Sequence, residues 1–305
     1  MSAPQPSYTK VHHSASYPGI NPSQPSLSTA GKVVVITGAS GGIGRGTSSS
    51  FAKSGPRALI LLGRRPDALK ETARLAQAAN TELVIQTYEV ELCDTPGMRS
   101  VFDKVATEFG GIDILVHSAG KLAPVVPLLK ADPAIFLDGY ETTVVGTLNA
   151  AQAVVLANKD SREITIVHLT TAGILFPPFP GMGAYVSSKM AAVKLLQAFA
   201  GENSNVRLHH VHPGFLDTAM STELSKSIRL PFNYDDMSLP ADFLVWIASP
   251  EAKFLHNKLV FTAWDVEELK SREKEIVGGP QGGGELWLGF QGFPRYIGDQ
   301  LLPGA

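Results

Sequence analysis

A tyrosine and a lysine stand four residues apart in the segment Tyr185-Val186-Ser187-Ser188-Lys189. On a helix this spacing places both side chains on one face. The pKa of a free phenol is about 10, and a neighbouring ammonium stabilises the phenolate and lowers that pKa toward working pH. Tyr185 would then give or take a proton during a reaction. Taken alone, such a pair is more often an ordinary surface pair, so its meaning depends on the rest of the chain.

A glycine-rich turn follows the first apolar run, at Thr37-Gly38-Ala39-Ser40-Gly41-Gly42-Ile43-Gly44. Glycines between a strand and a helix let backbone N–H groups approach a diphosphate, and the helix N-terminus adds a partial positive charge. By itself the segment is equally well explained as a flexible turn. Its place after the first strand of a wound sheet favours nucleotide binding, through Gly38, Ser40, Gly42, Ile43 and Gly44.

Two arginines, Arg64 and Arg65, follow the second apolar run, where an acidic residue would grip a ribose diol. A guanidinium pairs with a 2′-phosphate through its planar fork. The sequence therefore predicts NADP(H) rather than NAD(H) as the cofactor. The alternative is that both arginines simply face solvent, as most arginines do.

Short apolar runs alternate with longer helical patterns from Lys32 onward, which is typical of βαβ units. The fold class is α/β, a single doubly wound Rossmann-type domain over residues 31–270 with a seven-stranded parallel sheet flanked by helices. The predicted strands are Lys32–Thr37, Arg57–Leu62, Leu83–Tyr88, Ile112–His117, Ile164–Thr170, Val206–His212 and Lys258–Phe261. Helices are predicted at Pro66–Ala79, Met98–Phe109, Ala134–Ala157 and Tyr185–Ala200.

The two ends of the chain differ from the body. Residues 1–30 hold five prolines and seven serines, which indicates an extended or disordered arm outside the core. Residues 271–305 run through a glycine-rich stretch into the aromatic residues Trp287, Phe290, Phe293 and Tyr296. We expect this tail to pack on the domain or on a partner subunit.

Composition limits the classes of partner. The 305 residues carry a net charge of −2, so we expect neither nucleic acid nor a membrane as a partner. No apolar run is long enough to cross a bilayer, and the start of the chain lacks the apolar segment of a secretory signal. The lone Cys93 excludes an internal disulfide and suits a reducing compartment, so cytoplasm is the default. We expect no metal site, since the histidines around the sixth strand are more often structural.

The glycine turn and the Tyr-x-x-x-Lys segment resemble, in order and separation, the short-chain dehydrogenases/reductases. The resemblance covers Gly31 to about Leu269. The long arm, the stretch from Trp264 to Leu269 and the aromatic tail are similar to reductases of fungal natural-product pathways. The resemblance implies hydride transfer between a nicotinamide and a carbonyl or carbinol carbon, and a homo-oligomer (dimer or tetramer).

Further cofactor contacts follow from the resemblance. Glu91 and Leu92 stand where the family has Asp-Leu beside the adenine. The segment His117-Ser118-Ala119-Gly120 replaces the family's Asn-Asn-Ala-Gly, and His212–Thr218 resembles its Pro-Gly turn at the nicotinamide. The residues implied are Ser118, Ala119, Gly120, Pro213, Gly214, Leu216 and Thr218, together with Tyr185 and Lys189 at the ribose and nicotinamide.

The resemblance also assigns catalytic roles. Tyr185 exchanges the proton at the substrate oxygen, and Lys189 holds the ribose hydroxyls and lowers the tyrosine pKa. The family's serine is replaced by threonine, with Thr171 the first choice and Thr170 the second, and its helix asparagine is replaced by Thr143. These changes leave three functions open: a reductase or dehydrogenase, an isomerase, cyclase or dehydratase using Tyr185 without net redox chemistry, and a catalytically weak nucleotide-binding partner protein.

Two segments should border the substrate, Ile174–Gly183 and Asp217–Pro240. The first is apolar and rich in proline, which favours a bulky hydrophobic ketone or alcohol. A packed surface loop explains it equally well. The second could form a lid that excludes water from the nicotinamide.

Overall fold

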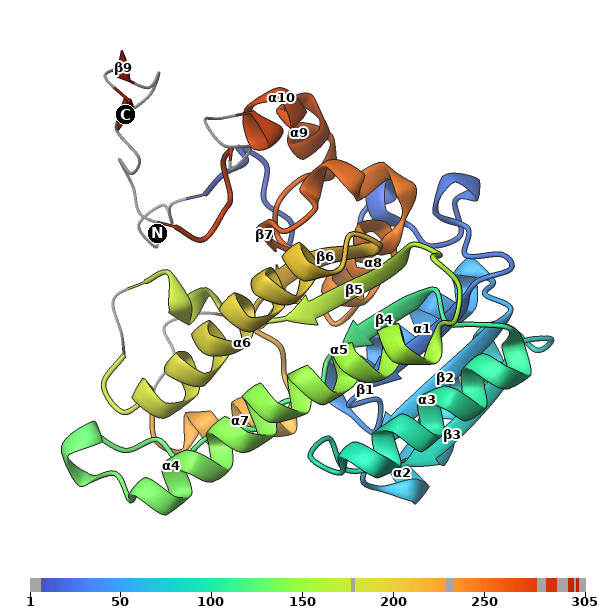
Figure 1. Ribbon diagram of the computed structural model, residues 1–305, viewed down its shortest axis with the longest axis horizontal. Coiled ribbons are helices and arrows are strands. Elements are labelled where there is room, and N and C mark those ends of the chain that lie inside the picture. The colour runs from blue at the N-terminus through green and yellow to red at the C-terminus, as the bar shows by residue number, and fades with distance from the viewer. Residues whose placement is uncertain are drawn as a thin grey trace.

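Seven parallel strands form one sheet, as predicted, and their order in the sheet is β3-β2-β1-β4-β5-β6-β7 (Figure 1). The computed structural model describes residues 7–176, 179–228, 233–278, 284–289, 296–298 and 300–301. Every predicted strand is confirmed to within two residues. The strands are β1 (Val33–Thr37), β2 (Ala58–Gly63), β3 (Val84–Glu89), β4 (Ile114–His117), β5 (Ile164–Leu169), β6 (Val206–His212) and β7 (Leu259–Phe261).

The order of the strands reverses between β1 and β4. The chain builds outward through β2 and β3 and then returns to place β4 on the other side of β1, with Val34 opposite Ile114 and Thr37 opposite His117. In open parallel sheets, ligands bind at the carboxyl ends of the strands beside such a reversal. Thr37 and His117 end their strands at this point, so the site is expected next to them.

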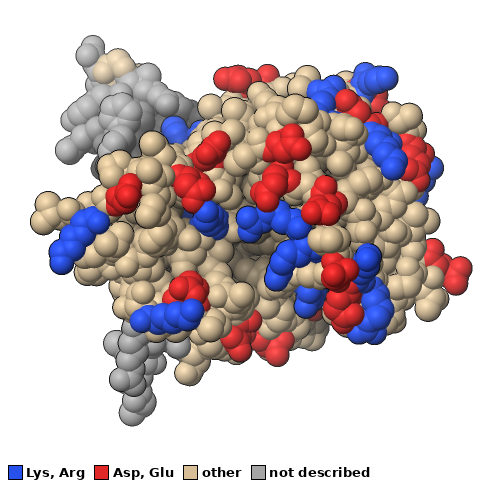
Figure 2. Space-filling view, turned by 90° about the horizontal axis from the view of Figure 1, so that it is seen from below, with Lys and Arg blue, Asp and Glu red and all other residues tan. Residues whose placement is uncertain are grey.

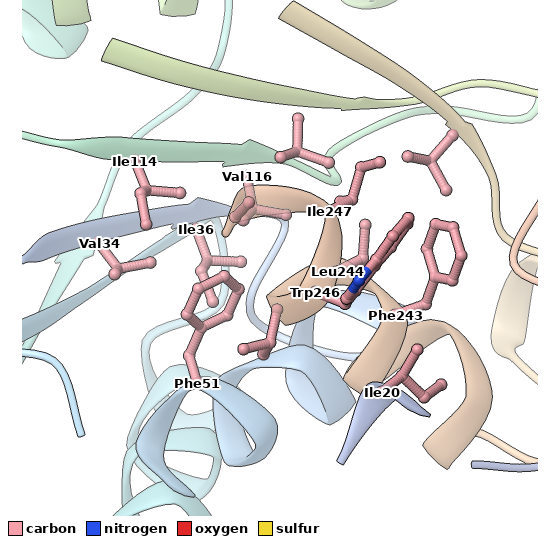
Figure 3. Close-up of a cluster of buried hydrophobic side chains, with 14 of the residues drawn as sticks. Ile20, Val34, Ile36, Phe51, Ile114, Val116, Phe243, Leu244, Trp246 and Ile247 are labelled. Atoms are coloured by element: carbon pink, nitrogen blue, oxygen red, sulfur yellow. The ribbon is translucent and has the colours of Figure 1, made fainter. Parts of the chain in front are cut away.

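Helices cover both faces of the sheet, which is why the central strands are buried along their whole length. In Figure 1, α3, α5 and α6 lie over one face. On the other face, Phe51 of α1 and Trp246 of α8 belong to one apolar cluster with Val34 and Ile36 of β1 (Figure 3). The main helices are α1 (Gly42–Ser54), α2 (Pro66–Ala79), α3 (Thr95–Phe109), α4 (Pro133–Tyr140), α5 (Gly146–Ala157), α6 (Gly183–Glu202) and α8 (Ser238–Ala248).

The helix predicted over 134–157 is interrupted by a π-helical turn. Asp132 caps α4, whose helical path continues through the π turn Glu141–Val145 into α5. A π turn inserts an extra residue into the helical repeat and is frequent at functional sites. The helix predicted at Met98 begins earlier, at Thr95, because the Asp94 carboxylate accepts a hydrogen bond from the Gly97 N–H.

The described part of the N-terminal arm corrects the expectation that it lies outside the core. Ile20 and Leu27 are 0% and 1% exposed and belong to the same apolar cluster as Trp246 (Figure 3). The arm is also fixed by polar contacts, since the Ser16 hydroxyl donates to Asp242 at 2.5 Å. Two short 3-10 turns, Pro18–Ile20 and Pro25–Leu27, present these apolar side chains.

The chain ends in short elements. After α7 (Ala219–Ser225) and α8 come the short helices α9 (Val266–Ser271) and α10 (Glu273–Val277). Two short strands follow, β8 (Tyr296–Ile297) and β9 (Gln300–Leu301), which pair with each other. Within the described tail, Leu286 packs against the core, and the Lys194 ammonium lies 5.5 Å from the centre of the Trp287 ring. Phe290 and Phe293 fall outside the described residues. The domain boundaries at residues 30/31 and 270/271 stay a prediction.

In the part of the chain that the structure describes, no helix combines the length and apolar character needed to cross a bilayer.

Candidate functional site

The glycine turn after β1 is conformationally restricted to glycine at two points. Gly38 has φ +68°, and a Cβ there would lie 2.8 Å from the backbone N and Cα of Ala119. A Cβ on Gly44 would lie 2.5 Å from the Gly38 carbonyl oxygen. α1 begins at Gly42 without a side-chain cap, so its first N–H groups face the turn unprotected by any side chain. A turn of this shape before a helix N-terminus fits a diphosphate.

A cavity of about 670 Å³ opens beside this turn. Figure 2 shows a hollow on the corresponding face, bordered by basic and acidic side chains. The structure brings together many residues that the sequence assigned to cofactor binding: the cavity is lined by Gly38, Ser40, Gly42, Ile43, Arg64, Arg65, Glu91, Leu92, Ser118, Ala119, Gly120 and Thr218. Gly44 lies under the turn, and Pro213, Gly214, Leu216, Tyr185 and Lys189 are outside this lining.

Three arginines, rather than the two predicted, reach the cavity. Arg45 and Arg65 each donate to the Ser40 carbonyl oxygen at 3.0 Å, which ties them to the glycine turn. Arg64 lies 3.8 Å from the Glu91 carboxylate, and both side chains are largely exposed. Sequence reasoning missed Arg45, although its place directly after the last glycine of the turn puts it in the first turn of α1.

Tyr185 and Lys189 lie on one face of α6, as their spacing predicts. Lys189 is 5% exposed, and its ammonium donates to the Leu169 carbonyl oxygen at 2.9 Å. The ammonium also approaches the cavity wall, because a Cβ on Gly120 would lie 3.3 Å from it. Burial lowers the pKa of Lys189 to about 8.

The pKa of the tyrosine departs from expectation. Burial raises the pKa of Tyr185 to about 12, whereas the sequence predicts that Lys189 lowers it. The cause is desolvation, which disfavours the charged phenolate. In the protein without a coenzyme, the pKa of Tyr185 is therefore raised and not lowered.

Two adjacent threonines follow β5 and have different surroundings. Thr171 caps the 3-10 turn Ala172–Ile174, and its hydroxyl oxygen accepts from the Gly173 N–H at 3.2 Å. Thr170 is buried, and its hydroxyl has no partner among the described residues. Strand alternation directs Thr170 to the same side as His168, the face covered by α6. The Thr170 hydroxyl thus has no partner among the described residues, while the Thr171 hydroxyl accepts one hydrogen bond and keeps its own proton to donate.

Thr143 occupies the π turn between α4 and α5. It is buried, and its hydroxyl also lacks a partner within the described ranges. Its carbonyl oxygen accepts a hydrogen bond from the Thr147 hydroxyl.

The segment after β6 turns back toward the glycine turn. Gly214 has φ +87°, and a Cβ there would meet the Asp235 carboxylate at 2.3 Å. Leu216 pairs with Asp235 in an isolated bridge, and Thr218 caps α7 through Ser221. A Cβ on Gly42 would lie 3.3 Å from the Thr218 methyl, so the segment and the glycine turn are in close approach.

The family match agrees with this geometry. Residues 32–229 match the family described as short chain dehydrogenase. The chain belongs to this family.

Several of its relatives among curated proteins are fungal. This short-chain dehydrogenase is 30% identical over 272 residues to short chain dehydrogenase mpl6 of Monascus purpureus, covering 88% of this chain and 92% of that protein. It is 32% identical over 284 residues to a short chain dehydrogenase/reductase of Claviceps purpurea, covering 90% and 92%.

Solved structures show the same fold. A short chain dehydrogenase from Mycobacterium paratuberculosis bound to NAD is 27% identical, with a TM-score of 0.69 over 79% of this chain and 99% of that one. A short chain dehydrogenase from Shigella flexneri complexed with NADP is 22% identical, with a TM-score of 0.70 over 78% and 99%. The chain is therefore an oxidoreductase-family member with a Rossmann-type fold, and these two structural neighbours are bound to nicotinamide cofactors.

Of the two substrate segments, part lies outside the described residues, namely 177–178 and 229–232. The described apolar side chains Leu175, Phe176, Phe179 and Met220 are exposed. Leu128, from the loop after β4, contacts the first turn of α6, since a Cβ on Gly183 would lie 2.8 Å from it. No group of three or more His, Cys, Asp or Glu side chains placed to hold a metal ion occurs within the described ranges.

Proposed function

We propose that this protein is an NADP(H)-dependent carbonyl reductase or alcohol dehydrogenase that acts on a hydrophobic ketone or alcohol in a secondary-metabolite pathway. The observation that carries the proposal is one cavity that is lined by the glycine turn and by Arg64 and Arg65. Gly120, in the same lining, lies next to the buried ammonium of Lys189. The fungal relatives support the pathway type.

The residues present fit a dinucleotide phosphate. Gly38 and the N–H groups at the start of α1 would hold the diphosphate, and Arg64 would pair with a 2′-phosphate. The Glu91 carboxylate lies 3.8 Å from the Arg64 guanidinium. Because both side chains are exposed, this ion pair is weak, and Arg64 can leave it to bind a phosphate. The nicotinamide ring, when bound, supplies or accepts the hydride at the substrate carbon.

The chain's own residues handle the proton. Tyr185 gives its phenol proton to the substrate oxygen during reduction and takes it back during oxidation. Lys189 would hold the ribose hydroxyls and carry the positive charge that stabilises the phenolate as it forms. Thr171 or Thr170 would donate a hydrogen bond to the substrate oxygen, because the Thr171 hydroxyl only accepts from the Gly173 N–H and the Thr170 hydroxyl has no partner among the described residues. Thr143 would take the place of the family's helix asparagine.

The exposed apolar side chains near the site support a hydrophobic substrate. Leu128, Phe176, Phe179 and Met220 border the loops that flank α4, α6 and α7. An apolar entrance favours a bulky uncharged ketone over a small charged one.

Coenzyme preference is the most direct test. NADPH and NADH should be titrated by fluorescence, with NADPH binding at least about tenfold more tightly because a charge-assisted bidentate pair contributes more than about 1.4 kcal/mol. Equal affinity, or tighter NADH binding, would overturn the NADP(H) assignment.

Turnover separates the redox function from the others. NADPH oxidation with a panel of hydrophobic ketones should be abolished by Tyr185→Phe and unaffected by Tyr88→Phe, a matched loss of one hydroxyl on β3, where that phenol donates to Gln86. Product formed without NADPH consumption would favour an isomerase, cyclase or dehydratase. NADPH binding without any Tyr185-dependent reaction would favour a nucleotide-binding partner protein.

Location and assembly complete the proposal. The only cysteine, Cys93, is unpaired, which suits a reducing compartment such as the cytoplasm. Val145 and Leu156 are exposed along the π turn and α5, which supports a homo-oligomer that covers them. Sedimentation of the purified protein would test the second point.

A further inference from the structure

Three buried histidines form a row across the sheet. His117 on β4 lies opposite His168 on β5, which lies opposite His210 on β6. None is more than 2% exposed. The row lies on the face that α5 and α6 cover. The proposed reaction uses none of the three, although His117 directly precedes the cavity residues Ser118, Ala119 and Gly120.

His117 stands in the middle of a hydrogen-bonded chain. Its Nδ1 is 2.9 Å from the Thr37 hydroxyl, which accepts from the Ala119 N–H at 3.3 Å. Its Nε2 is 3.1 Å from the Thr147 hydroxyl, which donates to the Thr143 carbonyl oxygen. The chain therefore runs from the cavity loop through the end of β1 to the π turn.

Only one tautomer satisfies every bond of this chain. The Thr147 hydroxyl gives its single proton to the Thr143 carbonyl, so its oxygen must accept from an N–H at Nε2 of His117. Nδ1 is then an acceptor and receives the Thr37 hydroxyl proton. The ring is a neutral connector with a fixed orientation, and both of its nitrogens are used.

Burial and the nearby Lys189 ammonium lower the pKa of His117 to about 3, which agrees with a permanently neutral ring. At neutral pH only about one ring in ten thousand would carry a second proton. Such a group is a poor proton carrier at working pH and a good structural connector.

We infer that His117 is a positioning residue for the coenzyme: it holds the cavity loop at Ala119 and the strand end at Thr37 in register with the π turn at Thr143. Thr37 and Ala119 both line the cavity, and so does Thr142 of the π turn, which means that His117 joins two separate parts of one binding surface. The inference rests on the proposed dinucleotide-binding function.

The same row supplies a matched control. His210 has the same burial and the same neighbour, His168, to which it bonds through the two Nδ1 atoms at 3.1 Å. Neither His168 nor His210 has a side-chain hydrogen bond to a cavity-lining residue within the described ranges. Loss of His210 should therefore disturb the core without disturbing the coenzyme site.

The experiment compares His117→Phe, His117→Gln and His210→Phe. Phenylalanine keeps the approximate shape and removes both bonds, whereas glutamine can accept at its oxygen and donate at its nitrogen. We expect His117→Phe to raise the NADPH Kd by about tenfold or more, because it breaks the chain at two bonds. The Kd of His117→Gln should stay within about threefold of the wild type, and that of His210→Phe within about twofold.

Hydrogen exchange provides a readout that needs no coenzyme. In the ligand-free protein, His117→Phe should accelerate amide exchange in 118–120 and in 141–147 together, and His210→Phe should not. Should His117→Phe fail to fold, Thr147→Val removes the two bonds of the Thr147 hydroxyl, to His117 and to the Thr143 carbonyl oxygen, and should give the same paired acceleration.

The inference is overturned if exchange in the two segments is unchanged, or if His210→Phe has the same effects as His117→Phe. If the wild-type protein binds no dinucleotide, the proposed function fails, and the exchange comparison still decides whether His117 joins the two segments.

Discussion

The two halves of the site carry their ionisable groups in opposite environments. On the nucleotide side, around β1 to β3, the side chains of Arg64 and Glu91 are 65% and 63% exposed. On the chemical side, around β4 to β6 and α6, Lys189 is 5% exposed and His117 and His210 are at most 2% exposed. The cavity thus has a solvated charged wall on one side, while the ionisable groups next to its other side are buried.

This difference in exposure determines whether a substitution affects ligand binding alone or also the stability of the fold. Exposed charges are screened by water and salt, so the nucleotide side can be altered with little effect on stability. A buried ionisable group must either lose its charge or destabilise the fold. The comparison predicts which substitutions change only ligand binding and which also change the free energy of unfolding.

Acid should have the largest effect, and it should act on the chemical side. Burial holds five histidines neutral in the fold, with pKa values lowered to about 3 for His117 and His210, to about 4 for His212, and well below the usual range for His168 and His209. Below about pH 6.5 the unfolded histidines bind protons that the folded ones do not, so stability present above that pH is lost as pH falls. The slope should approach five protons, or about 7 kcal/mol per pH unit.

The measurement is the free energy of unfolding in urea at pH 7, 6 and 5. His210→Phe should reduce the slope by one proton between pH 6 and pH 5. A total slope near one proton would show that the histidine row is not kept neutral.

Lys189→Met should have the next largest effect, with opposite signs on activity and stability. The buried ammonium has its pKa lowered from 10.5 to about 8, which corresponds to a destabilisation of up to about 3 kcal/mol below pH 8. Methionine removes that penalty, so the variant should unfold at higher urea concentration at pH 7. Its turnover should fall at least about a hundredfold, since the charge that assists Tyr185 is lost.

The pH dependence provides the control for Lys189. Between pH 8 and pH 10 the unfolded lysine still holds the proton that the folded one has released, so wild-type stability should gain from this group as pH rises, and Lys189→Met should lack the gain. Above pH 10 the raised pKa of Tyr185 acts in the opposite direction, which limits the useful window. A variant less stable than the wild type at pH 7 would contradict the prediction.

The strands and the glycine turn were predictable from the sequence, whereas the pKa of Tyr185 was not. The strands were predictable because their apolar runs are buried on both faces, and the glycine turn because its glycines follow the first apolar run directly. The sign of the Tyr185 pKa shift was not, since it depends on how deeply α6 is covered. Burial of a particular side chain is a property of the assembled layers.

Contacts between distant segments explain the other differences. Ile20 is an ordinary apolar residue in a proline-rich arm, and only its packing near Trp246 makes it part of the core. The sequence placed His117 at the start of the segment that replaces Asn-Asn-Ala-Gly, but its hydrogen bonds were not predictable because its partners Thr37 and Thr147 come from β1 and α5. The π turn around Thr143 likewise depends on packing rather than on the apolar period of the helix.

Gly38→Ala tests whether the nucleotide side, where charges can be changed with little loss of stability, is sensitive to changes of the backbone. A Cβ at φ +68° would meet Ala119 backbone atoms at 2.8 Å, so we expect a loss of about 2 kcal/mol and of dinucleotide binding. Gly55→Ala is the matched control, because Gly55 has φ +73° with nothing within 4 Å of the added carbon. It should lose only about 1 kcal/mol and keep binding; equal losses would mean that the contact with Ala119 has no role.

Arg64→Ala and Arg65→Ala should have the smallest effects on unfolding, within about 0.5 kcal/mol, because both side chains are exposed. Their effects on coenzyme choice should differ. Arg64 has only the weak Glu91 pair to give up, so its loss should weaken NADPH at least about tenfold and leave NADH unchanged. Arg65 donates to the Ser40 carbonyl and supports the glycine turn, so its loss should weaken both coenzymes by similar factors. If only Arg65→Ala lost NADPH binding selectively, Arg65 rather than Arg64 would be the residue that binds the 2′-phosphate. If either variant were clearly less stable than the wild type, the contrast between the exposed and the buried side of the site would not hold.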